Sequence, residues 1–105
     1  MDERAWPWGR DVPAADLVRE SWAATVAALP VEARITGEVI GRRPFGAFIR
    51  VGGVPYAVAL AEITAMPLGM DLPALGAFVG GEIVWHVAHN QQVKVRLDEW
   101  WAVDE

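Results

Sequence analysis

Hydrophobic residues repeat with two different spacings along the chain, and the spacing changes near residue 33. In the first part, apolar side chains recur at steps of three and four residues, which is typical of one face of an amphipathic helix. Asp11 is suited to cap this helix, Pro13 fits its first turn, and Pro30 ends it. The sequence therefore predicts one helix that follows an irregular arm of residues 1–11. Its inward face would consist of Leu17, Val18, Trp22, Thr25, Val26 and Leu29.

After residue 33, apolar and polar residues alternate with the period of a β-strand. Five strands are expected: one from Ala33, Phe45–Val51, Tyr56–Ala61, one after Gly80–Gly81, and Val93–Leu97. The side chains expected to point inward on the last three strands are Val58 and Leu60, then Ile83, Trp85 and Val87, then Val93, Val95 and Leu97. The connector of residues 63–77 is expected to hold a short helical turn and to pack Leu68, Leu72 and Leu75. Short alternating strands with glycines at the corners favour a small barrel.

The composition limits the class of protein. A chain of 105 residues that is 53% hydrophobic suits one domain with a buried core. It contains no cysteine, which excludes disulfides, thiolate nucleophiles and cysteine metal sites. No apolar run is long enough to span a bilayer, and the first residues lack the features of a signal peptide. We therefore expect no membrane association and a cytoplasmic location.

Side chains that could support catalysis or bind a metal are sparse. Ser21 is the only serine, and no nucleophile–base pair or phosphate-binding glycine loop occurs at the required spacing. We therefore expect no enzyme activity. His86 and His89 lie three residues apart with no obvious third ligand, so we expect neither a metal nor any other cofactor.

Charge is distributed unevenly along the chain, whose net charge is −5. Residues 34–97 contain six lysines and arginines against four acidic residues, which gives this part a charge of +2. Residues 1–33 carry −3 and residues 98–105 carry −4. The acidity therefore lies in the flanks, and the weakly basic middle permits contact with nucleic-acid phosphates.

The segment of residues 35–51 has the most specific pattern in the chain. A Gly-x-Val strand leads into a turn with Arg42 and Arg43, and the next strand begins Phe45-Gly-Ala-Phe48-Ile-x-Val. This order resembles the opening hairpin of the S1 domain family. Residues 56–63, the glycines at 80 and 81, and residues 94–97 are similar to later landmarks of that family, in the same order.

The resemblance implies a mainly β fold, a five-stranded S1-like OB barrel, preceded here by one N-terminal α-helix. It divides the chain into an arm and helix (1–33), the barrel (34–98) and an acidic C-terminal tail (99–105). S1 domains bind single-stranded RNA, so this chain is expected to bind RNA with little sequence preference. Ala59 stands where the family has a histidine, and Asp98 stands in place of its usual serine.

The family also implies which residues would contact RNA. Phe45 and Phe48 would stack on bases, and His89 and Asn90 would make polar contacts. The residues expected at phosphates are Arg42, Arg43, Arg50 and Lys94.

Two questions stay open at the level of sequence. The Phe45–Phe48 pair would be exposed for stacking if the helix caps an end of the barrel, or covered if the helix packs over it. The alternative function is a protein-interaction module that keeps the barrel but has lost RNA binding, which Ala59 and the acidic flanks favour.

The six tryptophans are expected to serve mainly in packing. We expect Trp22 and Trp85 in the core. The remaining four would fasten the arm and the tail to the barrel, and they are Trp6, Trp8, Trp100 and Trp101. One of the adjacent pair Trp100 and Trp101 would lie at a partner interface.

Overall fold

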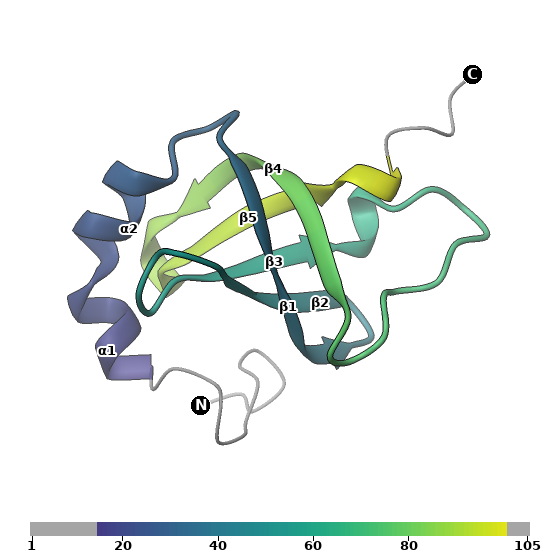
Figure 1. The fold of residues 1–105 in the computed structure, drawn as a ribbon, viewed down its shortest axis with the longest axis horizontal. Coiled ribbons are helices and arrows are strands. Elements are labelled where there is room, and N and C mark those ends of the chain that lie inside the picture. Colours follow the sequence, from purple (N-terminus) through teal and green to yellow (C-terminus); the bar gives the residue numbers. More distant parts are fainter. Residues whose placement is uncertain (1–14, 101–105) are drawn as a thin grey trace.

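The alternating segments after residue 33 form five strands that close into a barrel (Figure 1). The strands are β1 (Arg34–Arg43), β2 (Gly46–Val51), β3 (Val58–Glu62), β4 (Phe78–Val87) and β5 (Gln92–Leu97). Their order around the barrel is β1-β2-β3-β5-β4, and only the β3–β5 pairing is parallel. The prediction of a mainly β, five-stranded OB-type barrel is therefore confirmed.

The computed structural model describes residues 15–100. The expected arm with Trp6 and Trp8, the helix start at Asp11, and Trp101 with the rest of the acidic tail lie outside the described residues. Within residues 15–100, neither of the two α-helices has the length and apolar character needed to cross a membrane.

Small side chains on β2 and β3 line the barrel interior and face larger ones from the other strands. The inward residues are Ile35, Val39, Ala47, Ile49, Val51, Ala57, Ala59, Ala61, Ile83, Val93, Val95 and Leu97, all buried. The prediction for β5 is thus correct. The prediction for β3 was wrong, because Val58 pairs with Arg50 and Leu60 pairs with Phe48, which puts both on the outer face. A one-residue error in phase reverses every side chain of a strand.

A β-bulge changes the direction of side chains in the middle of β4. The pairing of β4 with β5 shifts between Ile83 and Trp85, so the two residues do not share a face. Ile83 is fully buried, whereas Trp85 is 65% exposed. The prediction that Trp85 lies in the core was therefore wrong.

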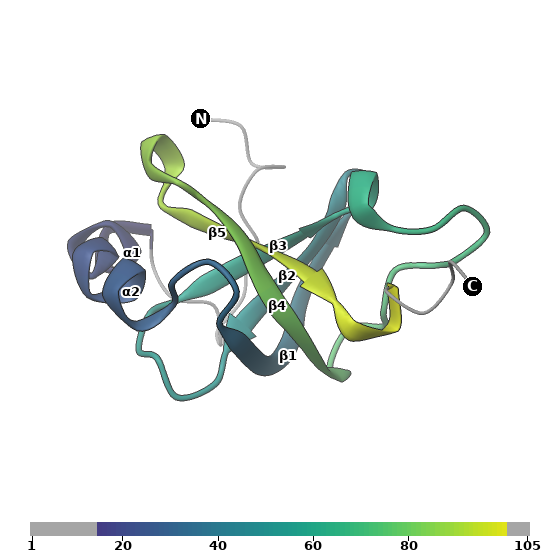
Figure 2. The same ribbon diagram turned by 90° about the horizontal axis from the view of Figure 1, so that it is seen from above.

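Two short helices stand where one helix was expected. Helix α1 (Ala15–Glu20) and helix α2 (Trp22–Ala28) are separated at Ser21, whose backbone leaves helical geometry with ψ near 3°. Both lie at one end of the barrel, and the connector between β3 and β4 extends at the other end (Figures 1 and 2). Helix α2 is fixed there by buried Leu29 and by His86, whose Nε2 donates a hydrogen bond to the Leu29 carbonyl oxygen at 2.6 Å.

The ends of the barrel are closed by side chains from outside the strands. Trp100, in the short helical turn η4 (Asp98–Trp100), is almost completely buried in the core, and Trp22 packs against the core while half-buried. In the connector, the expected helical turn is η2 (Ile63–Ala65). Leu72 packs against the core as expected, but Leu68 and Leu75 are exposed, which corrects the prediction for those two residues.

Candidate nucleic-acid interface

The tip of the β1–β2 hairpin carries two arginines and a phenylalanine. Arg42 is exposed and donates a hydrogen bond from Nη2 to the Leu72 carbonyl oxygen at 3.3 Å. Arg43 is half-buried and donates from Nη1 to the carbonyl oxygen of Arg42 at 2.9 Å. The half-buried Phe45 ring meets the Phe48 ring edge-to-face, with centroids 6.0 Å apart and an interplanar angle of 88°. The structure therefore brings the predicted Arg42, Arg43 and Phe45 together.

Phe48 is buried, with 0% of its surface exposed, so the expectation of an open ring at this position was wrong. Phe48 points to the outside of β2, where Val58 and Leu60 of β3 form an apolar cluster with it. Val18 of α1 belongs to the same cluster and is itself buried. Three large apolar side chains on the outer face of a small barrel would otherwise contact water, and their burial explains why α1 packs there.

Arg50 and Lys94, both expected at phosphates, are each paired with a carboxylate. Arg50 lies directly opposite Glu38 in the β1–β2 pairing and donates to Glu38 Oε1 at 2.6 Å. Lys94 makes a hydrogen-bonded ion pair with Glu62 of β3. A bound phosphate must therefore compete with a carboxylate for either cation, which weakens the electrostatic attraction that usually dominates nucleic-acid affinity.

The β4–β5 turn, which holds the other predicted contacts, is separate from the hairpin tip. His89 is exposed in the helical turn η3 (Ala88–Asn90), and the side chain of Asn90 lies outside the description. This turn lies toward the helix end of the barrel, away from the β1–β2 turn (Figures 1 and 2). His86 instead serves the packing of α2, and within residues 15–100 no three metal-ligating side chains gather at one place.

Within residues 15–100, three exposed aromatic rings were not predicted from the sequence. Phe78 is 81% exposed, Trp85 is 65% exposed and Tyr56 is 44% exposed. Trp85 lies directly opposite Lys94 on β5, and Phe78 lies directly opposite Glu38 on β1. The bulge in β4 interrupts the alternation before Trp85, and the turn before β3, which has a positive φ of 62° at Tyr56, interrupts it at Tyr56.

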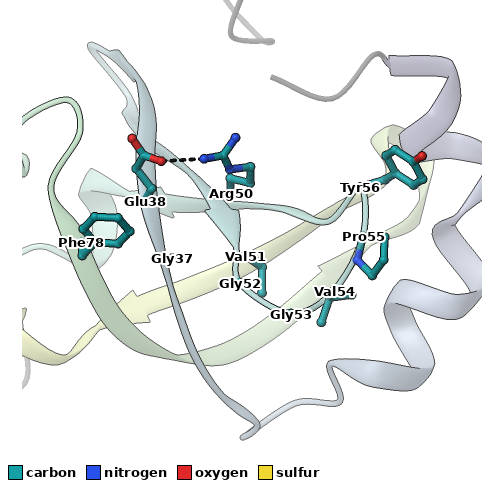
Figure 3. Close-up of a pocket in the computed structure, with 10 residues that line it drawn as sticks. All are labelled: Gly37, Glu38, Arg50, Val51, Gly52, Gly53, Val54, Pro55, Tyr56 and Phe78. Carbon is teal, nitrogen blue, oxygen red and sulfur yellow. Dashed lines mark hydrogen bonds and ion pairs between the residues drawn. The ribbon is translucent and has the colours of Figure 1, made fainter. Parts of the chain in front are cut away.

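Phe78 and Tyr56 lie on the same groove, which has a volume of about 540 Å³ (Figure 3). The hydrogen-bonded Glu38–Arg50 pair lies between the two rings. The β2–β3 turn forms one wall of the groove and contains two glycines. The groove is lined by Gly37, Glu38, Arg50, Val51, Gly52, Gly53, Val54, Pro55, Tyr56 and Phe78.

Comparison with known proteins gave matches in structure. No protein-family model and no curated protein sequence matches this chain. The solution structure of GSP13 from Bacillus subtilis superposes with a TM-score of 0.58 and 18% identity, over 73% of this chain and 62% of that one. The apo form of Mycoplasma genitalium RNase R superposes with a TM-score of 0.62 and 13% identity, over 74% of this chain and 15% of that one.

These matches and the strand order of the barrel show that the chain has an S1/OB-like fold. The match spans less than two thirds of either neighbour's length. At 13–18% identity the likeness concerns the fold. What the barrel binds has to be argued from its own surface.

Proposed function

We propose that this protein binds single-stranded RNA, with little sequence preference, on the outer face of its barrel around the β1–β2 hairpin. The observation that carries the proposal is the S1/OB-like barrel with Arg42, Arg43 and the half-buried Phe45 ring together at one hairpin tip. RNase R, a neighbour in structure, is an RNA-degrading enzyme by name, which supports RNA as the ligand. A cytoplasmic location is part of the proposal.

Phe45 supplies the stacking surface in this arrangement. Its edge-to-face contact with buried Phe48 holds the ring in place, so little side-chain freedom is lost when a base stacks on it. Stacking contributes about 1–3 kcal/mol per base and does not depend strongly on the identity of the base. Phe48 thus supports Phe45 from below, which is a different role from the one expected from the sequence.

The hairpin arginines supply the contacts to phosphate. The backbone carbonyl of Leu72 that Arg42 contacts is an uncharged acceptor, which a phosphate oxygen can replace at lower cost than it could replace a carboxylate. Arg50 and Lys94 would contribute less, since each has a carboxylate partner. Polar contacts of His89 and Asn90 with RNA remain a prediction. They require the RNA to extend to the β4–β5 turn.

The test is a titration of fluorescein-labelled single-stranded RNA at low salt, followed by anisotropy. We expect Phe45→Ala to bind about 5- to 150-fold more weakly than wild type, which is the loss of one stacked base. Leu68→Ala is the matched control, because Leu68 is a fully exposed apolar residue of the connector. Equal affinity of Phe45→Ala and wild type, or no binding by wild type, would contradict the proposal.

A second candidate function is supported by one observation. The described surface exposes two apolar side chains of the connector, Leu68 and Leu75. A protein-interaction module would have this character. A defined protein partner that is retained after complete RNA digestion, together with no affinity for RNA oligomers, would favour this function over the first.

A further inference from the structure

We propose that the groove between Phe78 and Tyr56 is a nucleobase-binding site, in which one base of a single-stranded nucleic acid stacks on Phe78 and places its polar edge on the Glu38–Arg50 pair. This inference rests on the proposed function and adds a second contact point to it. The groove differs in position from the Phe45 hairpin, since it opens beside the β2–β3 turn at the other end of β2.

The position of Phe78 is the first argument. Phe78 is the first residue of β4, and most of its ring is in water although the strand itself is part of a closed barrel. Its cross-strand neighbour on β1 is Glu38, and the cross-strand neighbour of Glu38 on β2 is Arg50. An aromatic ring is thus placed next to a fixed pair of hydrogen-bonding groups on one outer face (Figure 3). Proteins recognise the bases of single-stranded nucleic acids with this combination of a stacking surface and adjacent polar groups.

The charge of the pair decides which part of a nucleotide fits. Glu38 and Arg50 neutralise each other at 2.6 Å, so the groove offers no net positive charge to a phosphate. It does offer carboxylate oxygens that accept and guanidinium N–H groups that donate hydrogen bonds. The edge of a nucleobase is uncharged and carries both donors and acceptors. We therefore assign the groove to a base and leave the phosphates to the hairpin arginines.

The volume of the groove and its open wall agree with a ligand of the size of a nucleobase. Its volume of about 540 Å³ lies within the range of small-molecule clefts, roughly 300–1,000 Å³. Gly53 lines the wall with no side chain, and a Cβ at this position would meet nothing within 4 Å. The wall is therefore free of side-chain obstruction there. Tyr56, at the opposite end of the groove from Phe78, offers a second ring beside which a neighbouring base can lie.

The groove and the hairpin tip can belong to one bound strand. Phe45 precedes β2 and Arg50 is near its end, so the two sites are separated by about 16 Å at 3.3 Å per residue. A few nucleotides of single-stranded RNA cover this distance.

Photocrosslinking combined with one substitution tests this inference. The probe is a labelled RNA decamer with 5-iodouridine at alternate positions, crosslinked to the full-length protein and mapped by peptide mass spectrometry. We expect crosslinks at Phe78 or Tyr56, and we expect Phe78→Ala to bind the decamer about 5- to 150-fold more weakly. Leu75→Ala is the control, because Leu75 is an exposed apolar residue three positions earlier in the connector.

The outcomes separate this inference from the proposed function. If wild type binds RNA and Phe45→Ala weakens binding while Phe78→Ala does not, and crosslinks occur only near Phe45, the groove is not a base site and the proposed function stands. If wild type does not bind RNA, the proposed function fails and the inference fails with it.

A further variant tests the polar half of the site. Glu38→Gln keeps the shape of the side chain but removes its charge and turns one oxygen into an N–H donor. If a base edge contacts Glu38, the order of affinities for decamers of A, C, G and U should change, by about 5-fold or more for one base. A purely structural role would weaken all four equally, and that result would overturn the assignment of Glu38 to base contact.

Discussion

Phe48 is an aromatic residue on the outer face of a strand whose ring does not reach water. Its ring is enclosed by a cluster that includes Val18 from α1 and Leu60 from the neighbouring strand, and Phe45 lies across it. The side chain therefore acts in packing, and replacing it changes stability before it changes any contact with a ligand. A variant that removes both Phe45 and Phe48 consequently cannot separate a loss of RNA binding from a loss of folding.

Two single substitutions at Phe48 separate these effects. Phe48→Ala is expected to lower the free energy of unfolding by about 3–5 kcal/mol, because it leaves a cavity where the ring was. Phe48→Leu should cost less, about 1–2 kcal/mol, and should keep RNA affinity within about 2-fold of wild type. Urea unfolding and anisotropy titration measure the two quantities. A loss of affinity in Phe48→Leu as large as that in Phe45→Ala would mean that RNA reaches the Phe48 ring.

The sequence predicted the direction of side chains in a regular strand, but not the exposure of residues that depends on how two elements pack. The alternation of Val93, Val95 and Leu97 gave the correct inward face, because β5 is regular throughout. The exposure of Trp85 was missed, because the bulge after Ile83 depends on how two strands pair. The burial of Phe48 was missed for a similar reason, since it depends on where α1 packs.

The strands of the barrel approach each other closely at a few glycines. A Cβ on Gly37 of β1 would lie 2.3 Å from the carbonyl oxygen of Arg50 and 2.6 Å from Ile49 Cγ2. Backbone atoms of a paired strand cannot move aside without breaking the pairing. The sequence marked Gly37 as part of an alternating strand, but the need for glycine there is visible only once β2 lies across it.

Gly37→Ala is therefore expected to destabilise the barrel by about 1–3 kcal/mol through overpacking. Gly52→Ala is the matched control, because its nearest neighbour, the carbonyl oxygen of Thr36, would be 3.3 Å from the new Cβ and the residue lies in an exposed turn. We expect the control to stay within about 1 kcal/mol of wild type. Urea unfolding monitored by tryptophan fluorescence compares them, and equal stability of the two variants would show that β1 and β2 can separate to admit a methyl group.

In the part of the chain that the structure describes, ion pairs with carboxylates limit how much positive charge the surface offers. Arg34 is bound by both oxygens of Asp98, and this hydrogen bond raises the pKa of Arg34 above its ordinary value. Arg50 and Lys94 have the partners Glu38 and Glu62. The fold could be predicted from hydrophobic pattern and family resemblance, whereas these pairings required the register of the strands. Glu38 and Glu62 are already counted in the charge of +2 for residues 34–97, but Asp98 lies outside this range, and its pairing with Arg34 lowers the charge to +1.

This pairing makes the salt dependence of RNA binding a test of the electrostatic argument. For single strands, the slope of log K against log salt is about −0.7 per phosphate contact, and contacts by Arg42 and Arg43 alone give about −1.4. Glu62→Gln releases Lys94 from its carboxylate, so we expect a slope steeper by about 0.7 and about 2- to 10-fold tighter binding at low salt. Asp71→Asn, an exposed change of the same charge in the connector, should alter neither quantity as much. If the two variants behave alike, net charge alone governs binding and Lys94 does not contact the phosphate.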